Sequence, residues 1–119
     1  LLPKAMTPGC TKEACDFRDR ADSLQTAGYS VIGISPDPIE RLSAFREKES
    51  LNYPLLSDQG HAVAESFGAW GVKKNYGREY EGLIRSTFVV DEGGQVTHIY
   101  RNVRASGHVA RVSRDLLTE

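Results

Sequence analysis

The first part of the chain has apolar residues at helical spacing. A helix is predicted from about Pro8 to Ala27, because apolar positions recur there every three or four residues. Its apolar face consists of Ala14, Phe17, Ala21 and Leu24. Thr7 is a suitable N-cap, Pro8 suits the first helical position, where its missing N–H costs nothing, and Gly28 offers a C-terminal stop.

An apolar, β-branched run follows at Tyr29–Ser35 and predicts a buried strand. A second helix is then expected, with Asp37 as its N-cap, Pro38 at the first position and Glu40 as the reciprocal capping partner. Its inner face is predicted to contain Ile39, Leu42 and Phe45. The charged residues between positions 40 and 49 indicate a solvated outer face.

The middle of the chain has weaker patterns. Tyr53–Ser57 indicates a short strand or an extended segment, and His61–Phe67 a short helix that ends near Gly68. The segment Gly71–Gly82 is polar and contains several glycines, so it is predicted to be a loop.

The last third predicts two strands and a helix. Ile84–Val90 and Gln95–Tyr100 are the strands, and Asp91–Gly94 is the hairpin turn between them. The apolar face of the final helix contains Val109, Val112 and Leu116. Helices and strands therefore alternate, which predicts a single α/β domain over residues 1–119, with a mixed sheet and helices on both faces.

Composition narrows the possible functions. Of the 119 residues 39% are apolar and 26% charged, and the formal net charge is −1, whereas nucleic-acid-binding domains are usually basic. No apolar run approaches the roughly 18 residues of a membrane span, and no signal peptide is recognisable. The chain opens at Leu1 without a methionine, so we expect that an N-terminal part precedes it.

The chain contains two cysteines, Cys10 and Cys15, five positions apart. Small secreted domains that rely on disulfides usually have four or more cysteines. Two close thiols without an export signal favour a reducing compartment, and we expect a cytoplasmic location. In that setting the thiols are catalytic, redox-active or simply buried.

Cys10 is placed where a thiolate is favoured. It lies in the predicted first turn of the first helix, after the loop Pro3–Thr7. The first backbone N–H groups of a helix lack internal partners, and the helix dipole places partial positive charge at that end. Cysteines in such positions have pKa values lowered from about 8.5 to about 3.5–7.5, and the thiolate is the reactive form.

The neighbours of Cys10 suit attack on a peroxide. The Thr7 hydroxyl and the backbone N–H of Cys10 can both bond a substrate oxygen; a plain helix N-cap is the alternative role of Thr7. Pro3 and Pro8 carry no N–H group and can shield the sulfur from water.

The arrangement proline, three residues, threonine, two residues, cysteine resembles the active-site motif of peroxiredoxins, with Pro3, Thr7 and Cys10 at its fixed positions. The longer string PKAMTPGCTKEAC is similar to the Q-type subfamily, also called bacterioferritin comigratory proteins. The resemblance continues through VIGISPD, PLLSD, WGVK and IRSTFVVD. It implies a thioredoxin-like fold, and it implies a hairpin and a first central strand upstream of the motif, which this chain is expected to lack.

The resemblance also implies a role for Arg85, as the arginine that lies beside the attacking sulfur and polarises the peroxide bond. From the residues alone, an arginine on an edge strand facing water is the alternative. Glu13, one turn after Cys10, either bonds Arg85 and holds it in place or is a solvated first-turn acid.

Cys15 has two interpretations, a buried small residue or a resolving thiol, and the match to CTKEAC implies the second. Five residues along an ideal helix separate two Cα atoms by roughly 8.6 Å. A disulfide needs about 4.4–6.8 Å, so the first helical turns must unwind before the bond forms.

We therefore predict a thiol-dependent peroxidase for hydrogen peroxide and organic hydroperoxides, reduced by a thioredoxin-like donor. The resemblance implies a monomer. We expect no cofactor, and the composition and the scattered histidines, which match no zinc spacing, predict no nucleic-acid, membrane or metal partner. Trp70 either lines the substrate pocket or only packs. The alternatives are a thiol–disulfide oxidoreductase, against which the absence of a C-x-x-C pair counts, and a non-catalytic redox sensor.

Overall fold

The protein was analysed as a computed structural model, which describes residues 1–75 and 77–117. Residues 118–119 of the predicted domain lie outside that part. The helices are α1 (Pro8–Thr26), α2 (Ile39–Lys48), α3 (Ala62–Ser66) and α4 (His108–Leu117). The strands are β1 (Gly33–Ser35), β2 (Leu55–Ser57), β3 (Trp70–Asn75), β4 (Arg78–Leu83), β5 (Ser86–Val90) and β6 (Val96–Arg101). None of the helices described is long and apolar enough to cross a membrane.

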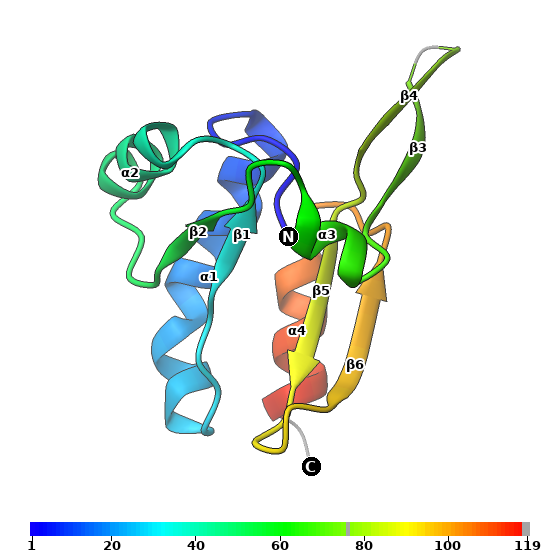
Figure 1. Ribbon diagram of the computed structural model, residues 1–119. Coiled ribbons are helices and arrows are strands. Elements are labelled where there is room, and N and C mark those ends of the chain that lie inside the picture. The colour runs from blue at the N-terminus through cyan, green and yellow to red at the C-terminus, as the bar shows by residue number, and fades with distance from the viewer. Residues whose placement is uncertain (76, 118–119) are drawn as a thin grey trace.

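The predicted mixed sheet is divided into three pairs of strands (Figure 1). β1 and β2 are parallel, whereas β3 with β4 and β5 with β6 form antiparallel hairpins. Helices α1 and α4 lie side by side, and α2 packs against β2. The α/β class is therefore as predicted, but β1 and β5 are not hydrogen-bonded to each other in this structure.

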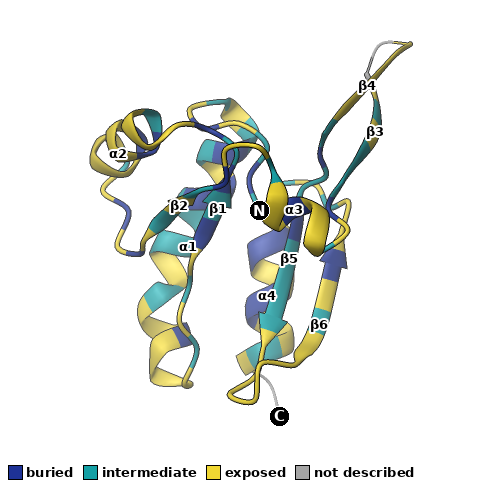
Figure 2. Cartoon of the chain, in the orientation of Figure 1, coloured by how far each residue is buried: buried dark blue, intermediate teal, exposed yellow. Residues whose placement is uncertain are grey.

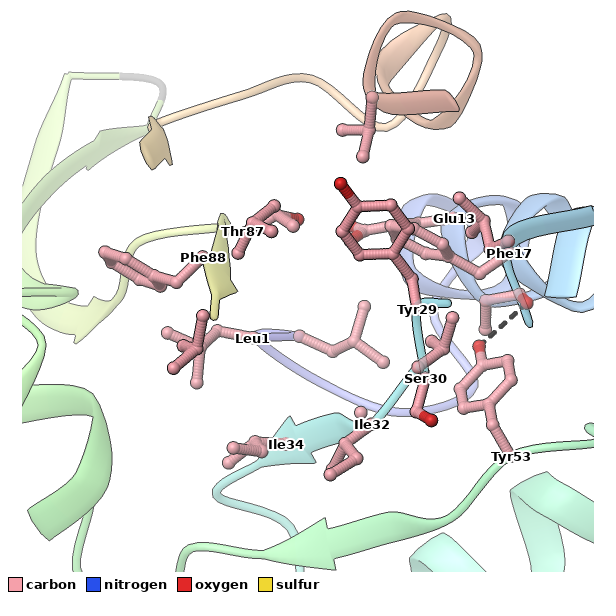
Figure 3. Close-up of a pocket in the computed structure, with 18 of the residues that line it drawn as sticks. Leu1, Glu13, Phe17, Tyr29, Ser30, Ile32, Ile34, Tyr53, Thr87 and Phe88 are labelled. Carbon is pink, nitrogen blue, oxygen red and sulfur yellow. Dashed lines mark hydrogen bonds between the residues drawn. The ribbon is translucent and has the colours of Figure 1, made fainter. Parts of the chain in front are cut away.

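A cavity of about 450 Å³ separates β1 from β5 (Figure 3). Its lining is largely apolar and includes Leu1, Ile32, Ile34, Thr87 and Phe88. The first two residues lie between the edges of β1 and β5. The Leu1 nitrogen donates to Ser86 O at 2.9 Å, and the Leu2 N–H donates to Ile34 O at 2.8 Å. A strand upstream of Leu1, as the resemblance implies, would continue into this cavity. That upstream strand stays a prediction.

The main core lies between the start of α1 and α2. Cys10 and Ala14 pack there against Leu42 and Phe45, and the buried Tyr53 closes the cluster by donating its hydroxyl to Ala14 O at 2.8 Å. Figure 2 shows the buried residues on the inner side of α1 and the exposed ones on its outer side. This amphipathic division is the reason why the predicted helix forms, and α1 ends one residue before the predicted Ala27.

The strand predicted at Tyr29–Ser35 is shorter than expected. Only Gly33–Ser35 forms a ladder, because its partner β2 is three residues long. The preceding residues border the cavity, where no described strand pairs with them, and Ile32 is 54% exposed. The predicted strand is thus confirmed over Gly33–Ser35 and wrong over the preceding residues.

The second helix begins one residue later than predicted. Pro38, not Asp37, occupies the N-cap position, and no side chain caps the helix. Leu42 and Phe45 are buried as expected, whereas Ile39 is 68% exposed, so its assignment to the inner face was wrong. On an ideal helix Ile39 lies about 120° around the axis from Phe45, so it is at the edge of the buried face.

The loop predicted at Gly71–Gly82 is wrong. β3 and β4 form an antiparallel hairpin there, in register from Trp70 opposite Leu83 to Asn75 opposite Arg78. The hairpin extends away from the body, and most of its residues are exposed (Figure 2). With no face packed on a core, it lacks the alternation of apolar and polar residues by which strands are recognised.

The C-terminal hairpin and helix are as predicted, with small shifts. β5 starts at Ser86 rather than Ile84. The turn is stabilised by Asp91, whose carboxylate accepts from the N–H groups of Gly93 and Gln95, both at 2.9 Å. α4 buries Val109 among its apolar residues, and it also buries His108, which sequence patterns did not mark.

His108 makes stability depend on pH. Burial lowers the pKa of its imidazole from 6.5 to about 4, and a Thr87 Oγ1 to Nε2 hydrogen bond of 2.7 Å holds the ring. Below pH 6.5 the unfolded chain binds a proton that the folded chain does not. We therefore expect stability to fall between pH 6.5 and 4, with a slope of up to about 1.4 kcal/mol per pH unit. Urea unfolding across this range checks this, and His108→Gln should flatten the slope, whereas His98→Gln should not.

Candidate active site

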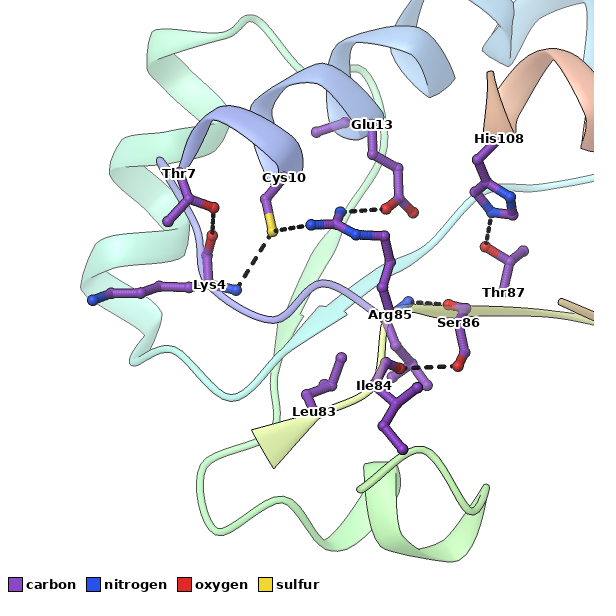
Figure 4. A network of polar contacts seen from close by, with 12 residues as sticks. Lys4, Thr7, Cys10, Glu13, Leu83, Ile84, Arg85, Ser86, Thr87 and His108 are labelled. Carbon is purple, nitrogen blue, oxygen red and sulfur yellow. Dashed lines mark hydrogen bonds and ion pairs between the residues drawn. The ribbon is translucent and has the colours of Figure 1, made fainter. Parts of the chain in front are cut away.

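Cys10 lies in the first turn of α1 and is fully buried. Two N–H donors point to its sulfur (Figure 4): the backbone N–H of Lys4 lies 3.5 Å and the Nη2 of Arg85 3.6 Å from Sγ. Both donors favour a negative charge on the sulfur, in addition to the helix N-terminus. The structure thus brings Cys10 and Arg85 together, although they are 75 positions apart in the chain.

Arg85 lies in the short segment between β4 and β5 rather than within a strand. Its Nη1 forms an ion pair with Oε1 of Glu13 at 2.6 Å. Glu13 is buried and Arg85 half-buried, with 2% and 16% of their side chains exposed, so neither the water-facing arginine nor the solvated acid describes this structure. Glu13 fixes one end of the guanidinium while the other end contacts the sulfur.

The surroundings shift the pKa of both partners. Burial raises the pKa of the Glu13 carboxyl, and the hydrogen bond from Arg85 opposes this rise. For Arg85, burial by itself lowers the pKa, but the bond to Glu13 and the nearby Cys10 sulfur outweigh it and raise the pKa overall. The guanidinium is therefore a permanent positive charge beside the sulfur.

Gly9 is a site residue that the sequence patterns did not single out. A Cβ at this position would lie 2.9 Å from Nη2 of Arg85, closer than such atoms normally approach. The missing side chain therefore leaves the space that the guanidinium occupies beside Cys10. Its place directly before the cysteine was the only available signal, because the partner is remote in sequence.

Thr7 occupies the N-cap position of α1, but its side chain does not cap the helix. The hydroxyl donates to Lys4 O at 2.7 Å and so closes the loop in front of Cys10. Pro8 is the first helical residue, as predicted, and the half-buried Pro3 begins the same loop.

Cys15 is half-buried on α1, and both cysteines are free thiols. Its Sγ donates to Oε1 of Glu49 at 3.5 Å. Burial raises the pKa of the Cys15 thiol, Glu49 raises it further, and Arg18 opposes the rise. The two cysteines thus have different surroundings: basic groups around Cys10, and an acidic partner for Cys15.

Trp70 lies at the start of β3 and stacks on His61, with ring centroids 3.7 Å apart and an interplanar angle of 5°. This contact favours the packing interpretation of Trp70, since its described ring partner is outside the Cys10 cluster.

The sequence matches a known protein family. The model of the AhpC/TSA family matches residues 1–99, most of the chain. This chain belongs to the AhpC/TSA family. Peroxiredoxin Bcp of Escherichia coli K12 is 50% identical over 108 residues, which cover 91% of this chain and 69% of that protein. Peroxiredoxin Bcp of Bacillus subtilis 168 is 46% identical over 116 residues, 98% of this chain and 74% of the relative.

Solved structures agree with the sequence comparison. The bacterioferritin comigratory protein of Xanthomonas campestris, whose structures are described in terms of alkyl peroxide reduction, superposes with a TM-score of 0.90 at 34% identity. The match covers 97% of this chain and 73% of that one. The thioredoxin-like fold and the Q-type resemblance are confirmed, and the chain is a peroxiredoxin, an enzyme of the thiol peroxidase class.

Proposed function

We propose that this peroxiredoxin reduces hydrogen peroxide and organic hydroperoxides with Cys10 as the attacking thiolate. The observation that carries the proposal is the arrangement of the Lys4 and Arg85 N–H donors at 3.5 and 3.6 Å from a buried sulfur in the first turn of a helix. Two fixed donors at this position stabilise the thiolate before the reaction and the developing negative charge on the peroxide oxygen during it.

In the first step the Cys10 thiolate attacks one peroxide oxygen. A sulfur–oxygen bond forms, the oxygen–oxygen bond breaks, and the leaving oxygen takes its electron pair and a proton to become water or an alcohol. Cys10 becomes a sulfenic acid. Arg85, held by Glu13, and the Thr7 hydroxyl bond the peroxide oxygens and stabilise their developing negative charge. Pro3 and Pro8 restrict the access of water to the sulfur.

In the second step Cys15 attacks the sulfenic sulfur, and a disulfide forms as hydroxide leaves and is protonated to water. The α1 geometry requires the first helical turns to unwind, and the Cys15 thiol must leave Glu49. A thioredoxin-like dithiol then reduces the disulfide. We place the reaction in the cytoplasm, with the enzyme as a monomer, in line with the Q-type resemblance.

Rapid mixing of the reduced protein with hydrogen peroxide tests this proposal, with Trp70 fluorescence and intact mass as readouts. We expect rapid loss of both thiols in the wild type, and a stable sulfenic acid in Cys15→Ser. Insulin reduction without peroxide turnover would instead indicate a thiol–disulfide oxidoreductase. If the protein is oxidised once and consumes no further peroxide when a reductant is supplied, it is a redox sensor.

A further inference from the structure

The carboxylate of Asp37 does not cap the helix that it was predicted to cap. It reaches across to the loop in front of Cys10, where its Oδ2 accepts from the backbone N–H of Ala5 at 2.7 Å. The Ser35 hydroxyl donates to the same oxygen. Asp37 is buried, so these bonds are made away from water, where a hydrogen bond to a charged acceptor is strong.

Arg41, in the first turn of α2, bonds the carbonyl of Ala5. Its Nη2 donates to Ala5 O at 2.9 Å, and its Nε lies 3.3 Å from Oδ1 of Asp37. Both backbone polar atoms of the fully buried Ala5 are thus held by one ion pair. We call Asp37 and Arg41 the loop clamp.

The loop clamp fixes the peptide unit directly after the one that contacts the sulfur. The Lys4 carbonyl and the Ala5 N–H belong to one planar group; the carbonyl accepts from Thr7 while the N–H donates to Asp37. The N–H of Lys4, the donor to the Cys10 sulfur, belongs to the preceding peptide unit and is joined to the fixed unit through the Lys4 Cα. The next residue, Met6, has a φ of 66°, a disfavoured conformation that persists only when its surroundings enforce it.

From this geometry we propose that Asp37 and Arg41 are positioning residues of the peroxidase: they hold the loop so that the Lys4 N–H stabilises the Cys10 thiolate. They touch neither sulfur nor substrate, and the inference rests on the proposed function of Cys10. Without the clamp the loop is free to leave the sulfur, which then loses one of its two N–H donors. The thiol becomes less acidic and the attack on peroxide slower.

The test measures the acidity of Cys10 directly, in a Cys15→Ser background where Cys10 is the single thiol. The rate of alkylation by iodoacetamide is followed from pH 4 to 10 for Asp37→Ala and for Arg41→Met. Arg41 has a 39% exposed side chain, so its replacement keeps the test open if Asp37→Ala fails to fold. The charged groups that interact with the sulfur, namely the Leu1 amino group, Lys73 and Arg85, are unchanged in every variant, as is Glu13, the partner of Arg85.

Asp58→Ala is the matched control. Asp58 is an equally buried carboxylate that accepts two backbone N–H bonds, from Val63 at 3.0 Å and Ala64 at 2.9 Å, but these belong to α3 and not to the loop. It reports what the loss of a buried carboxylate does to the fold in general.

We expect the loop-clamp variants to lower the rate of Cys10 alkylation at neutral pH about tenfold, the scale of a lost hydrogen bond to a charged group. At neutral pH their peroxide rate should fall about tenfold. A larger fall in the alkylation rate in either variant than in Asp58→Ala supports the inference, and any other result overturns it. Failure of the proposed function is seen separately, as an unreactive wild type towards peroxide, because alkylation still reports the acidity of Cys10.

Discussion

Cys10→Ser should reduce peroxide consumption to the background rate of buffer alone. A serine hydroxyl stays protonated at neutral pH and forms no sulfenic acid, so both the nucleophile and the intermediate are lost. Serine is nearly isosteric with cysteine, and the fully buried position should accept it with little change in fold. Peroxide consumption in the presence of excess dithiol measures the effect.

Cys15→Ser is the matched control for this loss, because it removes a thiol from the same helix. It should retain the first turnover and consume one equivalent of peroxide per Cys10. Cys10→Ser protein that consumes peroxide as fast as the wild type would end the assignment of Cys10 as the nucleophile. Circular dichroism of both variants shows whether α1 is intact.

Arg85→Met should slow the reaction with peroxide by about 10²- to 10³-fold, the usual effect of removing one preorganised donor from a developing anion. It should also destabilise the fold, because Glu13 then remains buried without its cationic partner, at a cost of about 3–5 kcal/mol. Single-turnover kinetics measure the first effect and urea unfolding the second.

The Glu13→Gln/Arg85→Met double variant separates the two effects. Removing the unpaired Glu13 charge should restore much of the stability but none of the rate of reaction with peroxide. The pH dependence of the stability of Arg85→Met provides a second check. Burial raises the pKa of Glu13 above its unfolded value, so the folded state binds a proton more readily than the unfolded chain. Stability should therefore rise as the pH falls from above the folded pKa to below the unfolded one. An Arg85→Met protein with the wild-type peroxide rate would contradict the role of Arg85.

Much of the site could be predicted because its parts are local. Pro8, Gly9 and Cys10 place a thiol in the first turn of a helix, and a helix start depends on neighbouring residues and backbone N–H groups alone. The distance that separates Cys10 from Cys15 on an ideal helix likewise follows from their spacing. For Arg85 the residues left two interpretations open, and the family resemblance chose between them.

Other features depend on partners distant in sequence. Asp37 has the sequence signature of a helix cap, yet its carboxylate bonds Ala5, 32 positions away, because folding brings a loop with an unpaired N–H within reach. Gly9 is required by a guanidinium that approaches from position 85. The β3–β4 hairpin is held by backbone hydrogen bonds in a segment without a buried face, so its sequence has no apolar alternation that would predict the strands.

The sequence by itself determined the helix start, the placement of a reactive thiol there and the alternation of helices and strands, since these follow from spacing, capping and backbone chemistry over a few residues. The tertiary structure alone decided which charged groups lie against the sulfur and which backbone N–H points at it. The physical reason is that burial and electrostatic contacts arise between segments that only the packed chain brings together.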